Sequence, residues 1–136
     1  MPLPAIPVKW CLEPVYVPGV SYSGYDTEIA FTIYCVDWLR RSAIAFPDVG
    51  AYQHWHHSAN ERSGAQAGLQ AKLMGQSKGF PDLIHLGLRL AVELKMPKGI
   101  VSFEQQQWLD YLHSIGWTAE VVRSFEEFRE LVLDRV

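Results

Sequence analysis

Cysteine is rare in this chain, which has 136 residues and only two cysteines, Cys11 and Cys35. Two cysteines are too few for a disulfide framework, and they lack the spacing of metal ligands. We therefore expect reduced thiols in a cytosolic protein. The sequence also lacks a basic start followed by an apolar segment, and no stretch approaches the roughly 18 apolar residues of a membrane span. Secretion and membrane insertion are not expected.

Positive charge is also scarce. The chain has 12 lysine and arginine residues against 15 aspartate and glutamate residues, so its formal net charge is −3. Affinity for DNA usually depends on clustered lysine and arginine, and this balance argues against tight non-specific binding of a polyanion. It leaves room for a local basic rim, formed by Arg40, Arg41, Arg62, Lys72, Lys78 and Lys98.

Length and composition predict one folded domain preceded by an arm. The hydrophobic fraction of 49% is enough for one core at roughly 100 to 200 residues per domain. Prolines recur in the first part of the chain, at Pro2, Pro4, Pro7, Pro14 and Pro18. Because proline breaks helices and strands, we expect an extended arm over residues 1–24 and a folded domain over residues 25–136.

The first part of the domain predicts a helix, a short strand and a second helix. The first helix is expected over residues 26–41. Its buried side is expected to carry Ile29, Ile33, Val36 and Trp38 or Leu39. The strand is expected over residues 49–56, and the second helix over residues 66–74, where Gly75 ends it.

The centre of the chain predicts an antiparallel hairpin. Its two strand-like runs cover residues 82–86 and 88–96, with Gly87 as the turn signal between them. In the second run every other residue, from Leu88 to Met96, is apolar. Glu93 and Lys95 lie between these apolar positions and therefore point to the same side. Asp82 starts the first strand and lies opposite the later part of the second. Residues 97–99 form a further turn.

The last part of the domain predicts a helix, a strand and a helix. The first of these helices starts at Ser102 and ends at Gly116, the strand covers residues 117–123, and Ser124 caps the final helix. The apolar stripe of the longer helix comprises Phe103, Trp108, Leu109, Leu112 and Ile115. The whole order of elements predicts an α/β fold, a small mixed β-sheet flanked by helices.

Asp82, Glu93 and Lys95 form the strongest chemical pattern in the chain. Two carboxylates held close together supply the hard oxygen ligands that suit Mg²⁺ or Mn²⁺. A neighbouring lysine can orient a water molecule or stabilise negative charge that develops on a phosphate. The alternative is structural, because Asp82 could simply start a strand while Glu93 and Lys95 occupy its solvent side.

Other polar residues allow more than one interpretation. The histidines at residues 54–57 do not favour zinc, because only His54 and His56 share a strand face. Ser102 and Gln105 match a capping box, so the glutamine could serve the helix start instead of a metal site, and Gln106 or Gln107 could replace it there. Lysine at position 72 is equally compatible with a solvated helix face.

Taken in order, these motifs resemble the VRR-NUC domain, the virus-type replication-repair branch of the PD-(D/E)xK nuclease superfamily. The matching residues are His57, Asn60-Glu61-Arg62, Ala71-Lys72-Leu73-Met74-Gly75, Gly79-Phe80-Pro81-Asp82-Leu83, Glu93-Leu94-Lys95, Gly99, Ser102, Gln105, Trp108 and Gly116-Trp117, with Glu28 on an upstream helix. One departure is Glu61, where stand-alone members often carry glycine.

The resemblance implies a restriction-endonuclease-like core and metal-dependent hydrolysis of DNA phosphodiester bonds. Asp82, Glu93 and the backbone carbonyl of Leu94 would hold Mg²⁺ or Mn²⁺, and Glu28 would support the ion directly or through water. Lys95 would position or activate the attacking water, with Gln105 also in the site. The residues expected to contact DNA are Asn60, Arg62, Lys72, Lys78 and Lys98.

The resemblance also implies a homodimer, because stand-alone members resemble Holliday-junction resolvases and a two-fold pair of sites matches the symmetry of a four-way junction. Aromatic residues of the arm, such as Trp10 and Tyr16, could cover a dimer interface or fold back over their own domain. The alternatives for function are cleavage of flaps, nicks or single strands, and a catalytically silent DNA-binding module of a phage or mobile element.

Overall fold

The computed structural model of the chain describes residues 25–58, 69–70 and 72–136. The predicted arm, Cys11, Asn60 and Arg62 lie outside the described residues. The described part contains a four-stranded mixed sheet with the order β1-β2-β3-β4. The strands are β1 (Trp55–His57), β2 (Leu83–His85), β3 (Leu90–Leu94) and β4 (Thr118–Val122). Neighbouring strands are antiparallel from β1 to β3, and β4 runs parallel to β3.

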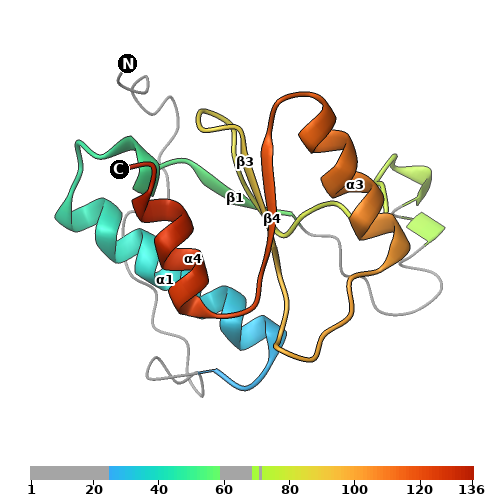
Figure 1. Cartoon of the computed structure of the whole chain (residues 1–136), viewed down its shortest axis with the longest axis horizontal. Coiled ribbons are helices and arrows are strands. Elements are labelled where there is room, and N and C mark those ends of the chain that lie inside the picture. Colours follow the sequence, from blue (N-terminus) through green and yellow to red (C-terminus); the bar gives the residue numbers. More distant parts are fainter. Residues whose placement is uncertain (1–24, 59–68, 71) are drawn as a thin grey trace.

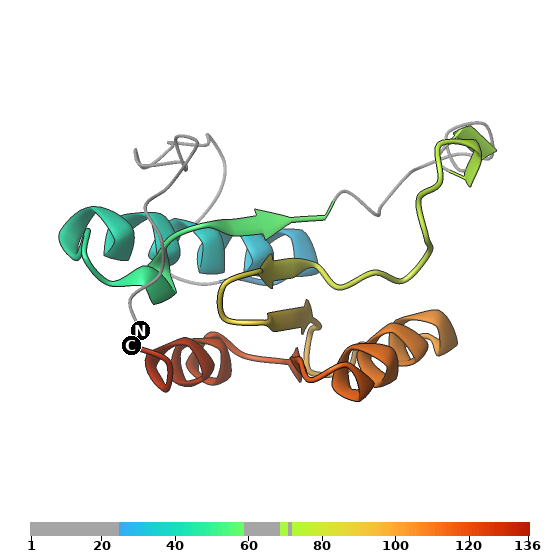
Figure 2. The ribbon, with the colours of Figure 1, turned by 90° about the horizontal axis from the view of Figure 1, so that it is seen from above.

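Helices cover both faces of this sheet, which confirms the predicted α/β class. They are α1 (Glu28–Ala45), α3 (Phe103–Ser114) and α4 (Phe125–Leu133). Figure 1 shows α1 and α4 together on one side of the strands and α3 on the other. Figure 2 shows α3 and α4 at opposite ends of β4. The larger core cluster lies under α1 and α4, and a smaller one lies under α3.

The hairpin forms as predicted, but its turn differs. The two strands are β2 and β3, and a four-residue turn over residues 86–89 joins them. The left-handed position in this turn is Arg89, with φ 51°, and not Gly87. Buried His85 explains the longer turn, because its Nδ1 accepts a hydrogen bond of 3.1 Å from the N–H of Leu88. Its Nε2 lies 3.0 Å from the carbonyl oxygen of Gly50.

The strand predicted over residues 49–56 is wrong in its first half. Gly50–Tyr52 form a 3₁₀ turn, and β1 begins only at Trp55. The N–H groups of Tyr52 and Gln53 bond to carbonyls of Val49 and Gly50, so this backbone is satisfied without a partner strand. His54 has φ 66° and interrupts any extended course.

The buried sides of two helices were predicted correctly only in part. In α1, Leu39 is buried and Val36 and Trp38 pack against the core as predicted, but Ile29 is 65% exposed. The buried residues of α1 are Phe31, Cys35, Asp37, Leu39, Ser42 and Ala43. Helix α1 packs against α4 through edge-to-face contacts of Trp38 with Phe125 and Phe128, whose ring centroids lie 5.5 and 6.1 Å away. In α3 only Leu109 and Leu112 are buried, while Phe103 and Ile115 are exposed.

The remaining predictions agree with the described residues. Of the helix predicted over residues 66–74, residues 69, 70, 72 and 73 are helical, and Gly75 follows with φ 84°. Ser124 accepts a hydrogen bond from the N–H of Glu127 at the start of α4. Helix α1 continues beyond Arg41 to Ala45, which makes it longer than predicted.

Candidate metal centre

Both faces of β3 are buried, and this places Glu93 inside the protein. Leu90, Val92 and Leu94 face the larger core cluster, as the alternation predicts. Glu93 and Lys95 lie on the opposite face, where the structural alternative expected solvent. That expectation is wrong, because α3 packs over this face and Glu93 is only 1% exposed. A carboxylate enclosed in this way needs compensating partners.

Asp82 is held beside Glu93 by backbone hydrogen bonds at the start of β2. Its Oδ2 accepts a hydrogen bond of 2.8 Å from the N–H of Leu94. Its carbonyl oxygen accepts another of 2.9 Å from the N–H of Ser58, just after β1. Three neighbouring strands therefore position this residue.

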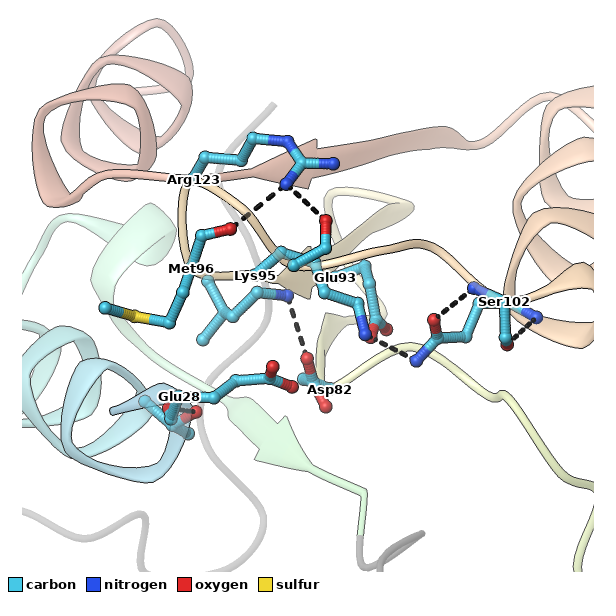
Figure 3. Close-up of polar contacts among 11 residues, drawn as sticks. Glu28, Asp82, Glu93, Lys95, Met96, Ser102 and Arg123 are labelled. Carbon is cyan, nitrogen blue, oxygen red and sulfur yellow. Dashed lines mark hydrogen bonds and ion pairs between the residues drawn. The ribbon is translucent and has the colours of Figure 1, made fainter. Parts of the chain in front are cut away.

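Glu28 reaches the same place from the first turn of α1. Thr27 caps this helix by accepting a hydrogen bond of 3.1 Å from the N–H of Ala30. Ligand oxygens of Glu28, Asp82 and Glu93 all lie within 4.8 Å of one another. Figure 3 shows Glu28 extending from α1 towards Asp82. A favourable helix dipole alone does not require such an approach to two other carboxylates.

The concentration of negative charge has a strong effect on Glu93. The pKa of Glu93 is raised from the usual 4.5 to about 8, mainly by burial and then by the charges of Asp82 and Glu28, whereas the charge of Lys95 opposes the rise. A hydrogen bond to Asp82 also favours the protonated form. Glu93 Oε2 is buried, and no donor among the described residues bonds to it. A cation would replace the proton and satisfy this oxygen.

Lys95 and Gln105 both contact the other oxygen of Glu93. Lys95 Nζ lies 3.9 Å from Glu93 Oε1, and both side chains are almost inaccessible to solvent. Gln105 Nε2 donates a hydrogen bond of 2.7 Å to the same oxygen. Gln106 instead donates to Asp110 on the exposed side of α3, and Gln107 lines a separate hollow. Of the three glutamines, the structure brings only Gln105 to the carboxylates.

Arg123 was missed by the sequence analysis. It follows β4, and its Nη1 donates a hydrogen bond of 3.0 Å to the carbonyl oxygen of Met96, as Figure 3 shows. The same Nη1 donates another of 2.7 Å to the carbonyl oxygen of Gly99. A side chain at Gly99 would meet the Lys95 stem, with a Cβ only 3.3 Å from its Cδ. Arg123 therefore holds the turn that packs on Lys95. The sequence indicated a turn there and gave no sign of this contact.

Three of the residues predicted to contact DNA, Lys72, Lys78 and Lys98, are described by the structure, and all three are exposed. Arg41, which belongs to the predicted basic rim, forms an ion pair with Asp37 at 2.8 Å. It lies thirteen positions after Glu28, which amounts to about 20 Å along α1. Arg41, near the end of α1, is therefore too far from Glu28 to form part of a basic rim around the carboxylates.

The donor set fits a hard divalent cation. Three carboxylates converge, and among the described residues one of their buried oxygens lacks a donor. Among the residues that the structure describes, this is the one group of three or more carboxylate, histidine or cysteine side chains whose ligand atoms lie close enough together to hold a metal ion. Within the same residues, no helix is long and apolar enough to cross a membrane.

Comparison with known proteins identifies relatives of this fold. A family model described as the VRR-NUC domain matches residues 45–126. A solved structure described as a VRR_NUC domain protein superimposes with a TM-score of 0.67 and 20% sequence identity, covering 83% of this chain and 90% of that chain. At this identity the match shows a shared fold. No curated protein matches the chain.

Proposed function

The chain belongs to the VRR-NUC nuclease family, and we propose that it is a metal-dependent deoxyribonuclease that hydrolyses phosphodiester bonds in branched DNA. The observation that carries this proposal is the convergence of Glu28, Asp82 and Glu93, with ligand oxygens within 4.8 Å of one another. Lys95 stands beside them, 3.9 Å from Glu93. Three carboxylates with a purely structural role would not be expected to converge in this way, because their mutual repulsion is unfavourable without a cation.

Asp82 and Glu93 would hold Mg²⁺ or Mn²⁺, with Glu28 as a direct or water-mediated ligand. A bound ion would polarise the scissile phosphate and lower the pKa of a water molecule. The register of β2 and β3 supports the carbonyl of Leu94 as a further ligand. Extending the Leu83–Val92 pairing by two positions places Pro81 opposite Leu94. Proline has no N–H, so it cannot donate a hydrogen bond to the carbonyl oxygen of Leu94, which leaves that oxygen available to an ion.

Lys95 would position the attacking water and neutralise charge on the phosphate. Its Nζ lies 3.9 Å from Glu93 Oε1, beside the proposed position of the ion. Gln105 would keep Glu93 oriented by donating to Oε1 and leaving Oε2 for the ion. The exposed Lys72, Lys78 and Lys98 would contact DNA phosphates, together with Asn60 and Arg62, which lie outside the described residues.

The finer part of the proposal concerns the substrate and the assembly. A homodimer would set two such sites at a fixed separation, as paired incision of a four-way junction requires. Flaps, nicks and single strands are the alternative substrates. Light scattering of the full chain and of a chain beginning at Ser23 tests the dimer. A monomer at micromolar concentration would exclude it, and a dimer unaffected by truncation would exclude the arm from the interface.

Cleavage assays test the nuclease itself. The protein is incubated with Mn²⁺ and labelled four-way junction, flap and linear duplex, in parallel with Asp82→Asn and Glu93→Gln. These substitutions keep the size of each side chain and remove its charge, so we expect folded proteins without activity. Glu120→Gln, which neutralises an exposed carboxylate of β4, is the matched control and should cleave normally. Activity retained in Asp82→Asn and Glu93→Gln would refute the proposed site.

A further inference from the structure

An aromatic surface lies next to the candidate metal centre and has no part in the chemistry above. It consists of Phe80, Trp108 and Tyr111, here called the Trp108 platform. The Trp108 ring centroid lies 5.0 Å from that of Phe80 and 6.0 Å from that of Tyr111, and both pairs are edge-to-face. These contacts fix the orientation of the indole. Tyr111 is nevertheless 54% exposed, and Phe80 and Trp108 are half-buried, so part of the platform is open to solvent.

Trp108 forms the wall between two hollows. One has a volume of about 400 Å³ and is lined by Lys78, Glu104, Gln107, Trp108 and Tyr111. The other has a volume of about 340 Å³ and is lined by His56, Ser58, Gly75, Gln76, Ser77, Phe80 and Trp108. Each is within the size range of sites that accept a small organic group. Polar side chains and an aromatic ring meet in both.

The three carboxylates line neither hollow, but residues that adjoin the candidate site do. Trp108 follows Gln105 by three positions on α3, so their side chains are neighbours on the helix surface. Gln105 in turn contacts Glu93. On the other side, the N–H of Ser58 bonds to the carbonyl oxygen of Asp82. A chain whose phosphate lay at the carboxylates could therefore place its adjoining nucleotide at Trp108.

Gly79 allows the loop before β2 to pack directly on α3. Its φ is +86°, and a Cβ there would lie 2.7 Å from the backbone N of Gln105. This close approach places Phe80 against Trp108 and Lys78 within 3.9 Å of Glu104. The platform is thus built by the same backbone that carries Gln105, which makes its position relative to the carboxylates definite.

The chemistry of the platform fits an unpaired nucleobase. Bases in single strands stack on exposed aromatic rings, whereas bases in a duplex already stack on one another. The side chains of Gln76 and Gln107 can bond to base edges, and Lys78 can contact a neighbouring phosphate. Affinity that comes from stacking also suits a chain with a net charge of −3, which has few cations to bind the backbone.

We propose that the Trp108 platform binds the unpaired nucleotide next to the scissile phosphate. The substrate then carries single-stranded DNA at the cleavage point, as in a flap or a free single strand, and a continuous duplex or a fully paired junction is cleaved less well. This inference rests on the proposed nuclease function and selects among its substrates.

Fluorescence of 2-aminopurine in the single-stranded arm of a flap tests the inference. Binding is measured in the Glu93→Gln background, where the DNA stays intact, and cleavage in the otherwise wild-type chain. Stacking on Trp108 should quench the probe. Trp108→Leu should abolish the quenching and weaken flap binding on the order of tenfold while leaving duplex binding unchanged. Trp108→Phe should retain part of the effect, because it keeps an aromatic face.

Controls separate stacking from folding. Phe46→Leu removes an aromatic ring that is 55% exposed and follows the far end of α1, and it should change neither signal. If Trp108→Leu lowers the melting temperature, Tyr111→Leu provides a second test that disturbs less packing. Unchanged quenching and an unchanged flap-to-duplex ratio in both variants would overturn the inference. If the wild-type chain cleaves no DNA, the proposed function fails, and the quenching still decides whether the platform binds unpaired bases.

Discussion

The side-chain amide of Gln105 bonds both to the backbone at the start of α3 and to the carboxylate of Glu93. Its Nε2 donates a hydrogen bond of 2.7 Å to Glu93 Oε1, and its Oε1 accepts one of 2.8 Å from the N–H of Ser102. The capping box and the site role therefore do not compete. The first turn of α3 is fixed to β3 through this residue, so the orientation of Glu93 depends on the capping of a helix.

Substitution of Gln105 should reduce activity more than loss of the cap alone explains. We expect Gln105→Ala to lose about 10- to 100-fold in Mn²⁺ affinity or turnover, the usual range for a residue that orients a metal ligand. Ser102→Ala removes the cap, costs about 1 kcal/mol of stability and leaves the amide beside Glu93. Gln106→Ala is the neighbouring control. Metal titration, steady-state cleavage and thermal melting measure the three variants, and equal activity in all of them would contradict the assignment.

Lys95 should act in the chemical step. Lys95→Ala removes the ammonium that lies 3.9 Å from Glu93, and we expect a loss of about 10²-fold or more in turnover with DNA binding largely retained. Single-turnover cleavage and fluorescence anisotropy separate the two effects. Lys98→Ala, on the exposed turn that follows, is the control for a lysine that only contacts phosphate. If Lys95→Ala weakens binding and leaves turnover intact, its role is that of a phosphate contact.

Arg123 should matter for turnover although it does not reach the carboxylates. Arg123→Met removes the donor to the carbonyls of Met96 and Gly99, so the turn that packs on Lys95 loses its support. We expect about tenfold lower kcat with KM little changed, since outer contacts of this kind typically tune activity by 10- to 100-fold. Arg135→Met breaks a comparable bond to the carbonyl of Leu131 in α4. It should reduce stability without lowering kcat, and a similar kcat in both variants would contradict this positioning role.

The raised pKa of Glu93 predicts a specific pH dependence. The unfolded chain loses this proton near 4.5 and the folded chain near 8, so its contribution to the stability of the metal-free protein falls as pH rises between these values. Because a metal ion needs the ionised form, Mn²⁺ affinity should rise over the same range. Buried His85 acts in the opposite sense, since burial lowers its pKa.

Comparison with Glu93→Gln isolates the carboxyl group, because the amide does not titrate. Urea unfolding in EDTA, repeated across this pH range, should show a decline with pH in the wild-type chain relative to the variant. Parallel curves for the two proteins would contradict the assignment of this titration to Glu93.

Local periodicity was enough to predict the centre of the site. The alternation of residues 88–96 placed Glu93 and Lys95 on one side of a strand, and a single turn placed Asp82 opposite them. Both depend on backbone geometry over a few residues, which the sequence expresses directly. The helix caps at Ser102 and Ser124 were predictable for the same reason. Glu28 entered only through the resemblance to a nuclease family, since it is far from the hairpin in the chain.

Tertiary packing decided the rest. The polar side of β3 became a buried face because α3 covers it, and a two-residue alternation cannot reveal what packs above a strand. The choice of Gln105 among three adjacent glutamines depends on how α3 is rotated against β3, and Gly79 permits that close approach. Arg123 contacts Met96 across 27 positions of sequence. Such contacts arise from the packing of segments that are distant in the chain, so no local pattern contains them.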